Sequence, residues 1–238
     1  KNSNQRLFPA SITKVMTALV ALEAYQLDQL LEVKTGITDG KVMGLTSGEK
    51  LTFENLLYAA LVDSANDAAY TIADNFPGGV EKFVAKMNQK AKELAMDDTN
   101  FTNPVGFEDS NHYSTAADLS RLAVVALANP VILQVVGIAR ITVPNSDFSK
   151  FYSLQSVNEL LGKVPGVLGL KTGWTNQAGE CLVTAMTRNN HQVLFIVLNS
   201  KDRFLETEKL IAWVFENFSW QTIILPRQDQ EPVQTPKS

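Results

Sequence analysis

The chain has 238 residues, of which 45% are hydrophobic and 19% are charged, and its formal net charge is −4. This composition is typical of a folded globular protein that buries its own core, whereas the negative charge and the lack of any run rich in Lys and Arg argue against nucleic-acid binding. No stretch approaches the roughly 20 apolar residues of a membrane span. The polar residues 1–6 lead into no apolar segment of a signal peptide, so an exported form would carry its signal outside this sequence.

Residues able to bind metals or form disulfides are scarce. Cys181 is the single cysteine, which excludes an internal disulfide and a cysteine-rich metal site. His112 and His191 lie far apart and show no zinc-ligand spacing. A Ser-His-Asp triad would have to use one of these two histidines, and geometry decides that question. We therefore expect no metal ion and no cofactor.

Helices are predicted to dominate the first two thirds of the chain. Pro9 suits the first turn of a helix, and the apolar residues from Val15 onward have helical spacing, which places Ser11 at the start of a helix that runs to about Leu27. Residues 33–50 are rich in Gly and Thr and are expected to form a loop with short strands. Further helices are predicted over residues 52–62, 64–73, 80–95 and 116–128, and Asn129-Pro130 should stop the last of them.

Strands are predicted mainly in the last third. Short strands are expected over residues 140–143, 151–154 and 167–172, followed by a hairpin of residues 182–187 and 192–198 around Asn189-Asn190. Because residues 193–198 are continuously apolar, we expect the second hairpin strand to be central and buried. A closing helix should follow over residues 202–218, and residues 228–238 read as a linker. These elements predict an α+β fold, with an antiparallel sheet flanked by helices and a mainly helical region.

Three short motifs point to one kind of chemistry. They are Ser11-x-x-Lys14, Ser64-Ala65-Asn66 and Lys171-Thr172-Gly173. This set, with Asp in place of Ala in the second motif, is typical of penicillin-binding proteins and β-lactamases.

Each motif also occurs a second time, so spacing alone does not identify a site. The second copies are Ser47-x-x-Lys50, Ser156-Val157-Asn158 and Lys34-Thr35-Gly36. A helix places residues i and i+3 on one face, and Pro9 with the apolar period favours a helix at Ser11, whereas Gly48 disfavours one at Ser47. Lys171 follows a predicted strand, whereas Lys34 leads into a loop. Taken singly, each motif is more often a cap, a turn or a surface strand, and their order and context favour the first set.

The residue types in the first set suit nucleophilic catalysis. A serine hydroxyl needs a base, and Lys14 can serve if it is neutral, which requires lowering its pKa from about 10.4 to near 7 at a cost of about 4 kcal/mol. Burial and the charge of Lys171 would both lower it. Ser64 can relay a proton to the departing amine. Asn66 can accept from Lys14 and donate to a substrate amide carbonyl.

The third motif offers a strand edge beside the nucleophile. Gly173 is expected to leave room for a substrate backbone along that edge. The backbone N–H groups of Ser11 and Trp174 can form an oxyanion hole.

The chain resembles the low-molecular-mass penicillin-binding proteins that are D-alanyl-D-alanine carboxypeptidases. The resemblance covers about residues 5–218 and includes PASITKVMTALVALE, LTSGEKLTFENLLYAALVDSANDAAYTIAD, TNFTNPVGFEDSNHYSTAADLSRLA and GLKTGWTNQAGECLV. It implies the β-lactamase/DD-peptidase fold, with a peptidase domain over residues 1–220 that contains a helical region at about 50–140. It also implies that N-terminal strands are truncated, and that residues 221–238 begin a linker to a missing C-terminal region.

The resemblance further implies an exported, extracytoplasmic serine peptidase that removes the terminal D-alanine of peptidoglycan stem peptides through an acyl-enzyme. Such an enzyme is acylated and inhibited by β-lactams, and a segment outside this chain can attach it to the membrane. Lys171 and Thr172 would bind the substrate carboxylate, with help from Arg203. Two positions depart from the usual pattern: Ala65 replaces a common glycine, and Trp174 can narrow the cleft or stack on substrate.

Two alternatives remain open from the sequence. A class A β-lactamase shares the motifs but needs a glutamate that activates the deacylating water, and the loop of residues 100–114 has only Glu108, without the expected Glu-x-x-Leu-Asn run. A catalytically silent penicillin-binding sensor would be acylated without processing peptide. Turnover of benzylpenicillin and release of D-alanine distinguish these classes.

Overall fold

The structure is a computed structural model that describes residues 1–221, and all of its helices but the last lie in the first two thirds. The helical elements are η1 (Ala10–Ile12), α1 (Thr13–Ala24), α2 (Phe53–Leu61), α3 (Asn66–Asp74), α4 (Gly79–Glu93), α5 (Ala116–Ala128), α6 (Pro130–Val136) and α7 (Arg203–Asn217). Capping explains several boundaries, since the side chains of Thr52, Thr115 and Asp202 accept backbone N–H groups in the first turns of α2, α5 and α7.

The strands form three antiparallel sets. They are β1 (Leu30–Glu32) with β2 (Lys50–Thr52), β3 (Arg140–Pro144) with β4 (Phe151–Gln155), and the sheet of β5 (Val167–Thr175), β6 (Gly179–Arg188) and β7 (His191–Ser200). The predicted hairpin turn is confirmed, because Asn189 and Asn190 both have the positive φ of a tight two-residue turn.

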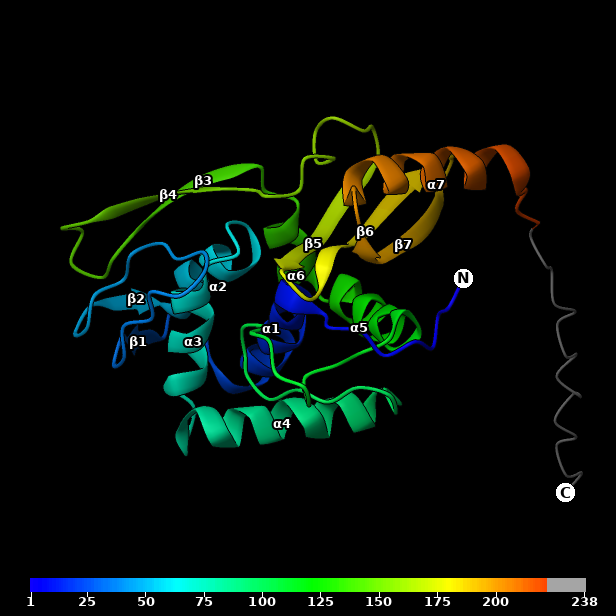
Figure 1. Ribbon diagram of the computed structural model, residues 1–238. Coiled ribbons are helices and arrows are strands. Elements are labelled where there is room, and N and C mark those ends of the chain that lie inside the picture. The colour runs from blue at the N-terminus through cyan, green and yellow to red at the C-terminus, as the bar shows by residue number, and fades with distance from the viewer. Residues whose placement is uncertain (222–238) are drawn as a thin grey trace, which may run out of the picture.

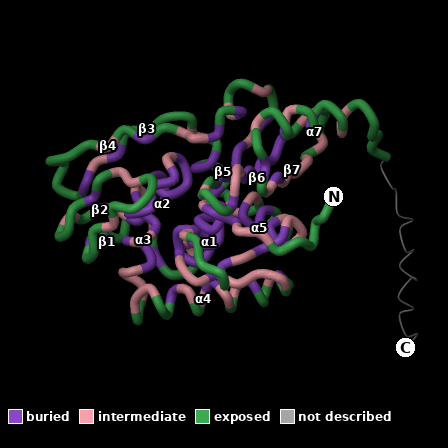
Figure 2. Tube along the Cα trace, viewed as in Figure 1, coloured by how far each residue is buried: buried purple, intermediate pink, exposed green. Residues whose placement is uncertain are grey.

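The larger sheet lies between helices. Helix α7 packs on β6 and β7, while α5, α6 and η1 contact the sheet from the region of α1 (Figure 1). The main hydrophobic core lies on the α1 side and includes most of α1, α2 and α3, which are the most deeply buried segments (Figure 2). The predicted α+β fold with an antiparallel sheet is therefore observed.

Three predicted elements differ from the structure. The strand over residues 193–198 is not central, because β6 lies between β5 and β7. Within residues 193–198 only Phe195 and Val197 are buried, and the others are half-buried. Asn129-Pro130 stops α5 but also starts α6, because Asn129 accepts N–H groups from the next turn and Pro130 occupies its first position. Helix α1 ends at Ala24, three residues before the predicted end. The predicted linker over residues 228–238 lies outside the described residues.

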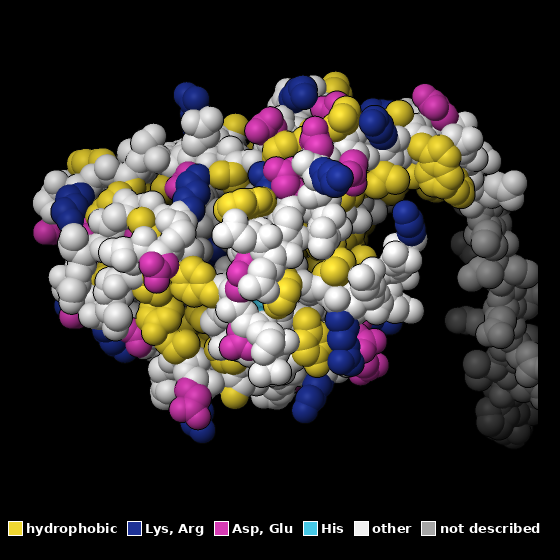
Figure 3. All heavy atoms as spheres, viewed as in Figure 1, with side chains coloured by type: hydrophobic (Ala, Val, Ile, Leu, Met, Phe, Trp, Pro, Cys, Tyr) yellow, Lys and Arg dark blue, Asp and Glu magenta, His cyan; other side chains and the backbone are white. Residues whose placement is uncertain are grey.

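The surface carries mixed charge on the face in Figure 3, where Lys and Arg side chains alternate with Asp and Glu side chains. Within residues 1–221, no single helix is long and apolar enough to cross a membrane. Helices α5 and α6 together pass that test by length and composition, but the chain bends by 99° between them.

Candidate active site

The three motifs meet in one cleft of about 580 Å³. Ser11 comes from η1, Ser64 and Asn66 from the start of α3, and Thr172 and Gly173 from the free edge of β5. The cleft is lined by Ser11, Gly40, Lys41, Ser64, Asn66, Val105, Gly106, Phe107, Glu108, Val157, Thr172, Gly173, Trp174, Thr175, Asn176 and Arg203.

Ser11 and Lys14 lie at the predicted helix start, although the first turn is a 3₁₀ turn. Ala10 has φ 48°, an uncommon conformation for a residue with a side chain, and such strain is frequent at functional sites. Lys14 is fully buried, and its Nζ lies 2.8 Å from Ser11 Oγ, 2.7 Å from Asn66 Oδ1 and 3.0 Å from the Val105 carbonyl oxygen. The expected pairing of serine and lysine across one helical turn is therefore observed.

Burial lowers the pKa of Lys14 to about 7, against the opposing charge of Asp67. The three contacts fit a neutral amine. Asn66 Oδ1 and the Val105 carbonyl accept only, so they take the two hydrogens of an –NH₂ group, and the remaining lone pair faces Ser11, whose hydroxyl can donate.

Ser64 lies beside a second buried lysine. Lys171 Nζ donates to Ser64 Oγ at 2.8 Å and to the Thr172 carbonyl at 3.0 Å. Burial lowers the pKa of Lys171 well below its ordinary value, and the charges of Lys14, Lys41 and Arg203 lower it further. The charge of Lys14 thus adds to the effect of burial on Lys171, whereas burial alone lowers the pKa of Lys14.

Gly173 lines the cleft, and its missing side chain also serves the turn that carries the nucleophile. A Cβ at this position would lie 3.0 Å from the Ser11 backbone nitrogen and 3.1 Å from the Pro9 carbonyl oxygen, so the missing side chain makes room for the nucleophile's own turn. The space at Gly106 is tighter still, because a Cβ added there would lie 1.9 Å from the Ala10 carbonyl oxygen. Gly106 also has φ +93°, which residues with a side chain rarely adopt. These two glycines let a strand and a loop approach Ser11 from two sides.

The other predicted substrate contacts surround the strand edge. Arg203, the first residue of α7, donates from Nη1 to the Gly173 carbonyl at 3.1 Å and lines the cleft, so it is not a solvated surface charge. Thr172 is buried, whereas Trp174 is 59% exposed at the rim.

Asn66 is held by the loop that precedes it. Its Nδ2 donates to the Asp39 carbonyl at 2.9 Å, which uses one of the two amide hydrogens, and its backbone N–H donates to the Lys41 carbonyl. Asp67, buried at the start of α3, accepts backbone N–H groups from Met43, Gly44 and Leu45. Sequence reasoning missed Asp67, although its place directly after the second motif, in the first turn of a predicted helix, was a signal.

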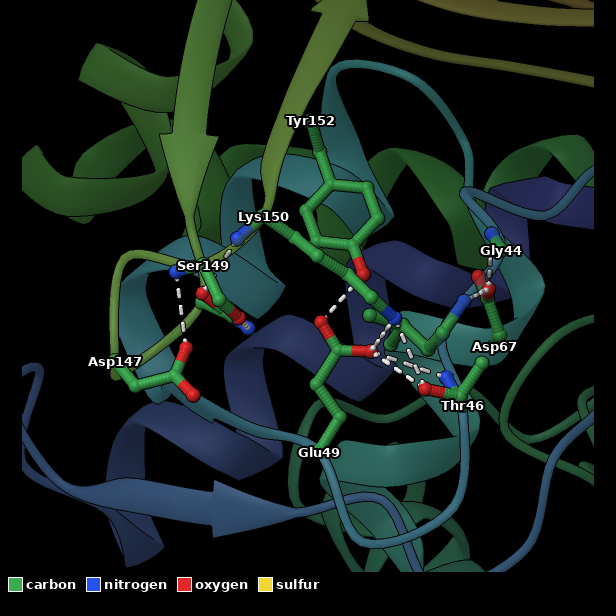
Figure 4. A network of polar contacts seen from close by, with 10 residues as sticks. Gly44, Thr46, Glu49, Asp67, Asp147, Ser149, Lys150 and Tyr152 are labelled. Carbon is green, nitrogen blue, oxygen red and sulfur yellow. Dashed lines mark hydrogen bonds and ion pairs between the residues drawn. The ribbon is translucent and has the colours of Figure 1, made fainter.

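The far end of this loop is fixed by the β3–β4 hairpin (Figure 4). Glu49 accepts hydrogen bonds from Thr46 and from Lys150 Nζ at 3.1 Å, and also from the Tyr152 hydroxyl. We call the side chains of Glu49, Lys150 and Tyr152 the hairpin clamp. No motif in the sequence indicated it, because its members lie about 100 residues apart in the chain.

The second copies of the motifs lie outside the cleft, apart from Val157 of the Ser156-Val157-Asn158 copy, and both histidines lie elsewhere. Ser47 Oγ donates to the Lys34 carbonyl, and Lys50 pairs with Glu32 on the surface. His112 is buried against Thr13 and Thr102 in the loop beside α1, where burial lowers its pKa to about 4. His191 stacks on Trp220. Neither ring lines the cleft, so the structure places no histidine next to Ser11.

Within residues 1–221, no three His, Cys, Asp or Glu side chains lie close enough together to bind a metal ion. Glu108, the acidic residue weighed for a deacylating role, lines the cleft, and its Oε1 accepts the backbone N–H of Gln177 at 2.8 Å.

Comparison with known proteins connects this site to one group of enzymes. D-alanyl-D-alanine carboxypeptidase DacF of Bacillus subtilis is 32% identical over 247 residues, which cover 100% of this chain and 63% of that protein. D-alanyl-D-alanine endopeptidase of Escherichia coli is 34% identical over 220 residues, covering 86% and 68%. The chain thus spans somewhat under two thirds of the first of these relatives.

Solved structures agree with the sequence relatives and confirm the expected DD-peptidase fold. The Streptomyces K15 DD-transpeptidase superposes with a TM-score of 0.85 at 30% identity, over 91% of this chain and 90% of that one. Penicillin-binding protein D2 of Listeria monocytogenes in its ampicillin-bound form gives 0.80 at 31% identity, over 90% of each chain. The sequence profile of D-alanyl-D-alanine carboxypeptidases matches residues 1–202, and the chain belongs to that family.

Proposed function

We propose that this protein is a serine-type D-Ala-D-Ala carboxypeptidase, which removes the terminal D-alanine from peptidoglycan stem peptides through an acyl-enzyme on Ser11. The observation that carries the proposal is the contact of 2.8 Å between Ser11 Oγ and the fully buried Nζ of Lys14, inside a cleft bounded by the edge of β5. Family membership and the names of the relatives support the substrate class.

Acylation begins with a proton transfer. The Ser11 hydroxyl gives its proton to the lone pair of neutral Lys14 while Oγ attacks the carbonyl carbon of the penultimate D-alanine. The developing oxyanion accepts from the backbone N–H groups of Ser11 and Trp174, which the close approach of Gly173 brings near each other. Ser64 then relays that proton from Lys14 to the departing amine, which returns Lys14 to its neutral form. Lys171 Nζ, 2.8 Å from Ser64 Oγ, orients the Ser64 hydroxyl.

Substrate orientation depends on the other end of the cleft. The terminal carboxylate would accept from Thr172 and pair with Arg203 and Lys171, and its negative charge would favour the charged form of Lys171. Asn66 would use its remaining amide hydrogen for the substrate's amide carbonyl. Water then hydrolyses the ester at Ser11 and releases the shortened peptide.

The proposal includes the setting of the reaction. Because the substrate is a cell-wall peptide, we place the protein on the extracytoplasmic side of the envelope, with residues 1–220 as the peptidase domain. β-Lactams are expected to acylate Ser11, in keeping with the ampicillin-bound relative. Attachment to the membrane through another segment stays a prediction.

The test combines two assays on one preparation. D-alanine release is measured from Nα,Nε-diacetyl-Lys-D-Ala-D-Ala, and the residue labelled by penicillin is mapped by mass spectrometry over time. Ser11→Ala should lose both activities, whereas Ser47→Ala, in the second Ser-x-x-Lys copy, should keep both.

The other outcomes identify the alternatives. Rapid turnover of benzylpenicillin would indicate a β-lactamase. A stable penicillin adduct without D-alanine release would indicate a sensor. Labelling that persists in Ser11→Ala would overturn the proposed nucleophile.

A further inference from the structure

The cleft is electrically polarised along β5. Positive charge lies at one end, where the Arg203 guanidinium contacts the Gly173 carbonyl, and Lys41, the other basic side chain that lines the cleft, pairs with Asp63. The acidic Glu108 lies at the other end, where the strand runs into the turn of residues 176–178.

Glu108 is fixed in place. Its Oε1 accepts the Gln177 backbone N–H at 2.8 Å, which ties the loop of residues 100–114 to the β5–β6 turn. Hydrogen bonds from the Thr175 hydroxyl and the Gln177 N–H lower the pKa of Glu108, so the group is an anion at neutral pH. The side chain is nevertheless exposed and lines the cleft, so a ligand can reach its carboxylate.

The direction of a bound peptide follows from the proposed function, on which this inference rests. The terminal carboxylate lies at Thr172 and Arg203, and the scissile carbonyl lies near Ser11, which Gly173 contacts. A peptide on the free edge of β5 therefore runs antiparallel to this strand. Its C-terminus lies at Thr172, and the residues before the C-terminus lie progressively closer to Thr175.

The spacing along the strand then decides which substrate residue meets Glu108. Strand residues advance about 3.4 Å each. If the terminal D-alanine lies at Thr172 and the penultimate one at Gly173, the residue before them lies at Trp174 to Thr175. That is the position of Glu108, and the side chain of this third residue from the end is the one that can reach it.

We propose that Glu108 forms a specificity subsite for a positively charged side chain on the residue that precedes D-Ala-D-Ala, the amine of a diamino acid. Trp174 completes the subsite. It lines the cleft next to Thr175 on β5, and its ring offers an apolar surface for the methylene chain and a π face for the ammonium group. The subsite thus selects stem peptides whose diamino acid still carries a free amine.

The experiment compares two peptides that differ only in that charge. Nα-acetyl-Lys-D-Ala-D-Ala has a free side-chain amine, and Nα,Nε-diacetyl-Lys-D-Ala-D-Ala has none. The measured quantity is the ratio of their kcat/KM values for D-alanine release. We expect the protein to favour the free amine about fivefold, the size of effect that a partly exposed ion pair supplies.

Variants separate charge from architecture. Glu108→Gln keeps an oxygen that accepts the Gln177 N–H but removes the charge, so the ratio should fall to about one, and Glu108→Lys should invert it. Asp109→Asn is the matched control: Asp109 neighbours Glu108 but accepts the Asn111 N–H and does not line the cleft, so the ratio should not change.

Two results would overturn the inference. A ratio near one in the unmodified protein, with both peptides hydrolysed, would remove the subsite and leave the proposed function intact. An equal fall of the ratio in Asp109→Asn would show that general surface charge, not the subsite, sets the preference. If neither peptide released D-alanine, the proposed function itself would fail, and this inference with it.

Discussion

The two Ser-x-x-Lys sequences of this protein have the same spacing and very different surroundings. Lys14 is 0% exposed, with its Nζ between Ser11, Asn66 and the Val105 carbonyl. The side chain of Lys50 is 51% exposed and pairs with Glu32 across β1 and β2. Only the first lysine pays the cost of desolvation, which is what makes its amine a base near neutral pH.

The same contrast separates the two Lys-Thr-Gly sequences. Lys171 is buried on a strand and donates to Ser64, whereas Lys34 lies on the surface and donates to the Asp74 carbonyl. The difference shows that a motif gains its chemistry from the packing around it. Three of the predictions below therefore compare a change in or near the cleft with a matched change in the surface copy or its ion-pair partner.

The largest effect is expected for the catalytic base. Lys14→Met should lower the rate of acylation by penicillin about 1,000-fold or more, because removal of a general base typically costs 100- to 10,000-fold. Lys50→Met should stay within about twofold, since an exposed ion pair contributes little. The measurement is the second-order acylation rate with a fluorescent penicillin, and near-normal acylation of Lys14→Met would exclude this lysine as the base.

Lys14→Met should also change how stability depends on pH. The pKa of Lys14 is lowered from 10.5 to about 7 on folding, so between those values the unfolded chain binds more protons and the free energy of unfolding rises with pH. In the variant, the free energy of unfolding should rise less steeply with pH, by up to about 1.4 kcal/mol per pH unit. Urea unfolding at pH 7.5 and 9 measures it, and an unchanged slope would show that Lys14 is charged in the folded protein.

The next effect concerns glycines. Gly106→Ala should destabilise the protein by about 3 kcal/mol or displace Ser11, because the new Cβ meets the Ala10 carbonyl oxygen at 1.9 Å. Gly48→Ala, beside Ser47, has a similar φ of +84° but open space around it, so about 1 kcal/mol of backbone strain is expected. Thermal unfolding and penicillin labelling of both variants test this, and equal losses would mean that strain, not the close approach, dominates at Gly106.

How much of this site the sequence could predict depends on distance along the chain. Lys14 lies one helical turn from Ser11, so helical periodicity was enough to pair them. Lys171 and Ser64 meet across 107 residues; the order of the motifs and the family resemblance placed both in one site but predicted no contact between them. Gly106 and the hairpin clamp act through long-range packing that leaves no local pattern, whereas Asp67 left one signal, its place directly after the second motif.

The sheet shows the same limit. Residues 193–198 are as apolar as a central strand, yet β7 pairs only with β6 among the described strands. A run of apolar side chains indicates that both faces of a strand are buried, but it does not indicate whether one or both of its backbone edges pair with neighbouring strands. Helix α6 was missed for a different reason. A proline can end one helix and also occupy the first turn of the next, and the prediction used Pro130 only as a helix stop.

The acylation rate is expected to follow the protonation of the base. Since the neutral amine is the active form and its pKa is about 7, the rate should fall about tenfold per pH unit below that value and level off above it. The profile of penicillin acylation from pH 5.5 to 8.5 measures this, with circular dichroism at each pH to show that the fold persists. A flat profile would contradict a lysine base.

The smallest effect is expected at the hairpin clamp. Burial acts to raise the pKa of Glu49, but hydrogen bonds from Tyr152, Lys150 and Thr46 outweigh it and lower the pKa below its ordinary value of 4.5. The clamp's contribution is therefore complete above about pH 4.5 and is lost as the pH falls through the lower, folded-state value. Glu49→Gln should cost about 1 kcal/mol at pH 7, the typical worth of a buried hydrogen bond.

The exposed partner of Lys50 supplies the comparison for the clamp. Glu32→Gln, whose ion pair with Lys50 is open to solvent at 3.4 Å, should cost less than about 0.5 kcal/mol. The difference in stability between Glu49→Gln and the unmodified protein should shrink when urea unfolding is repeated at pH 3.5. If it does not shrink, the Glu49 side chain acts by its shape and not by its charge. The loop that holds Asn66 would then be positioned by the Asp67 carboxylate and its backbone N–H donors, without help from the hairpin.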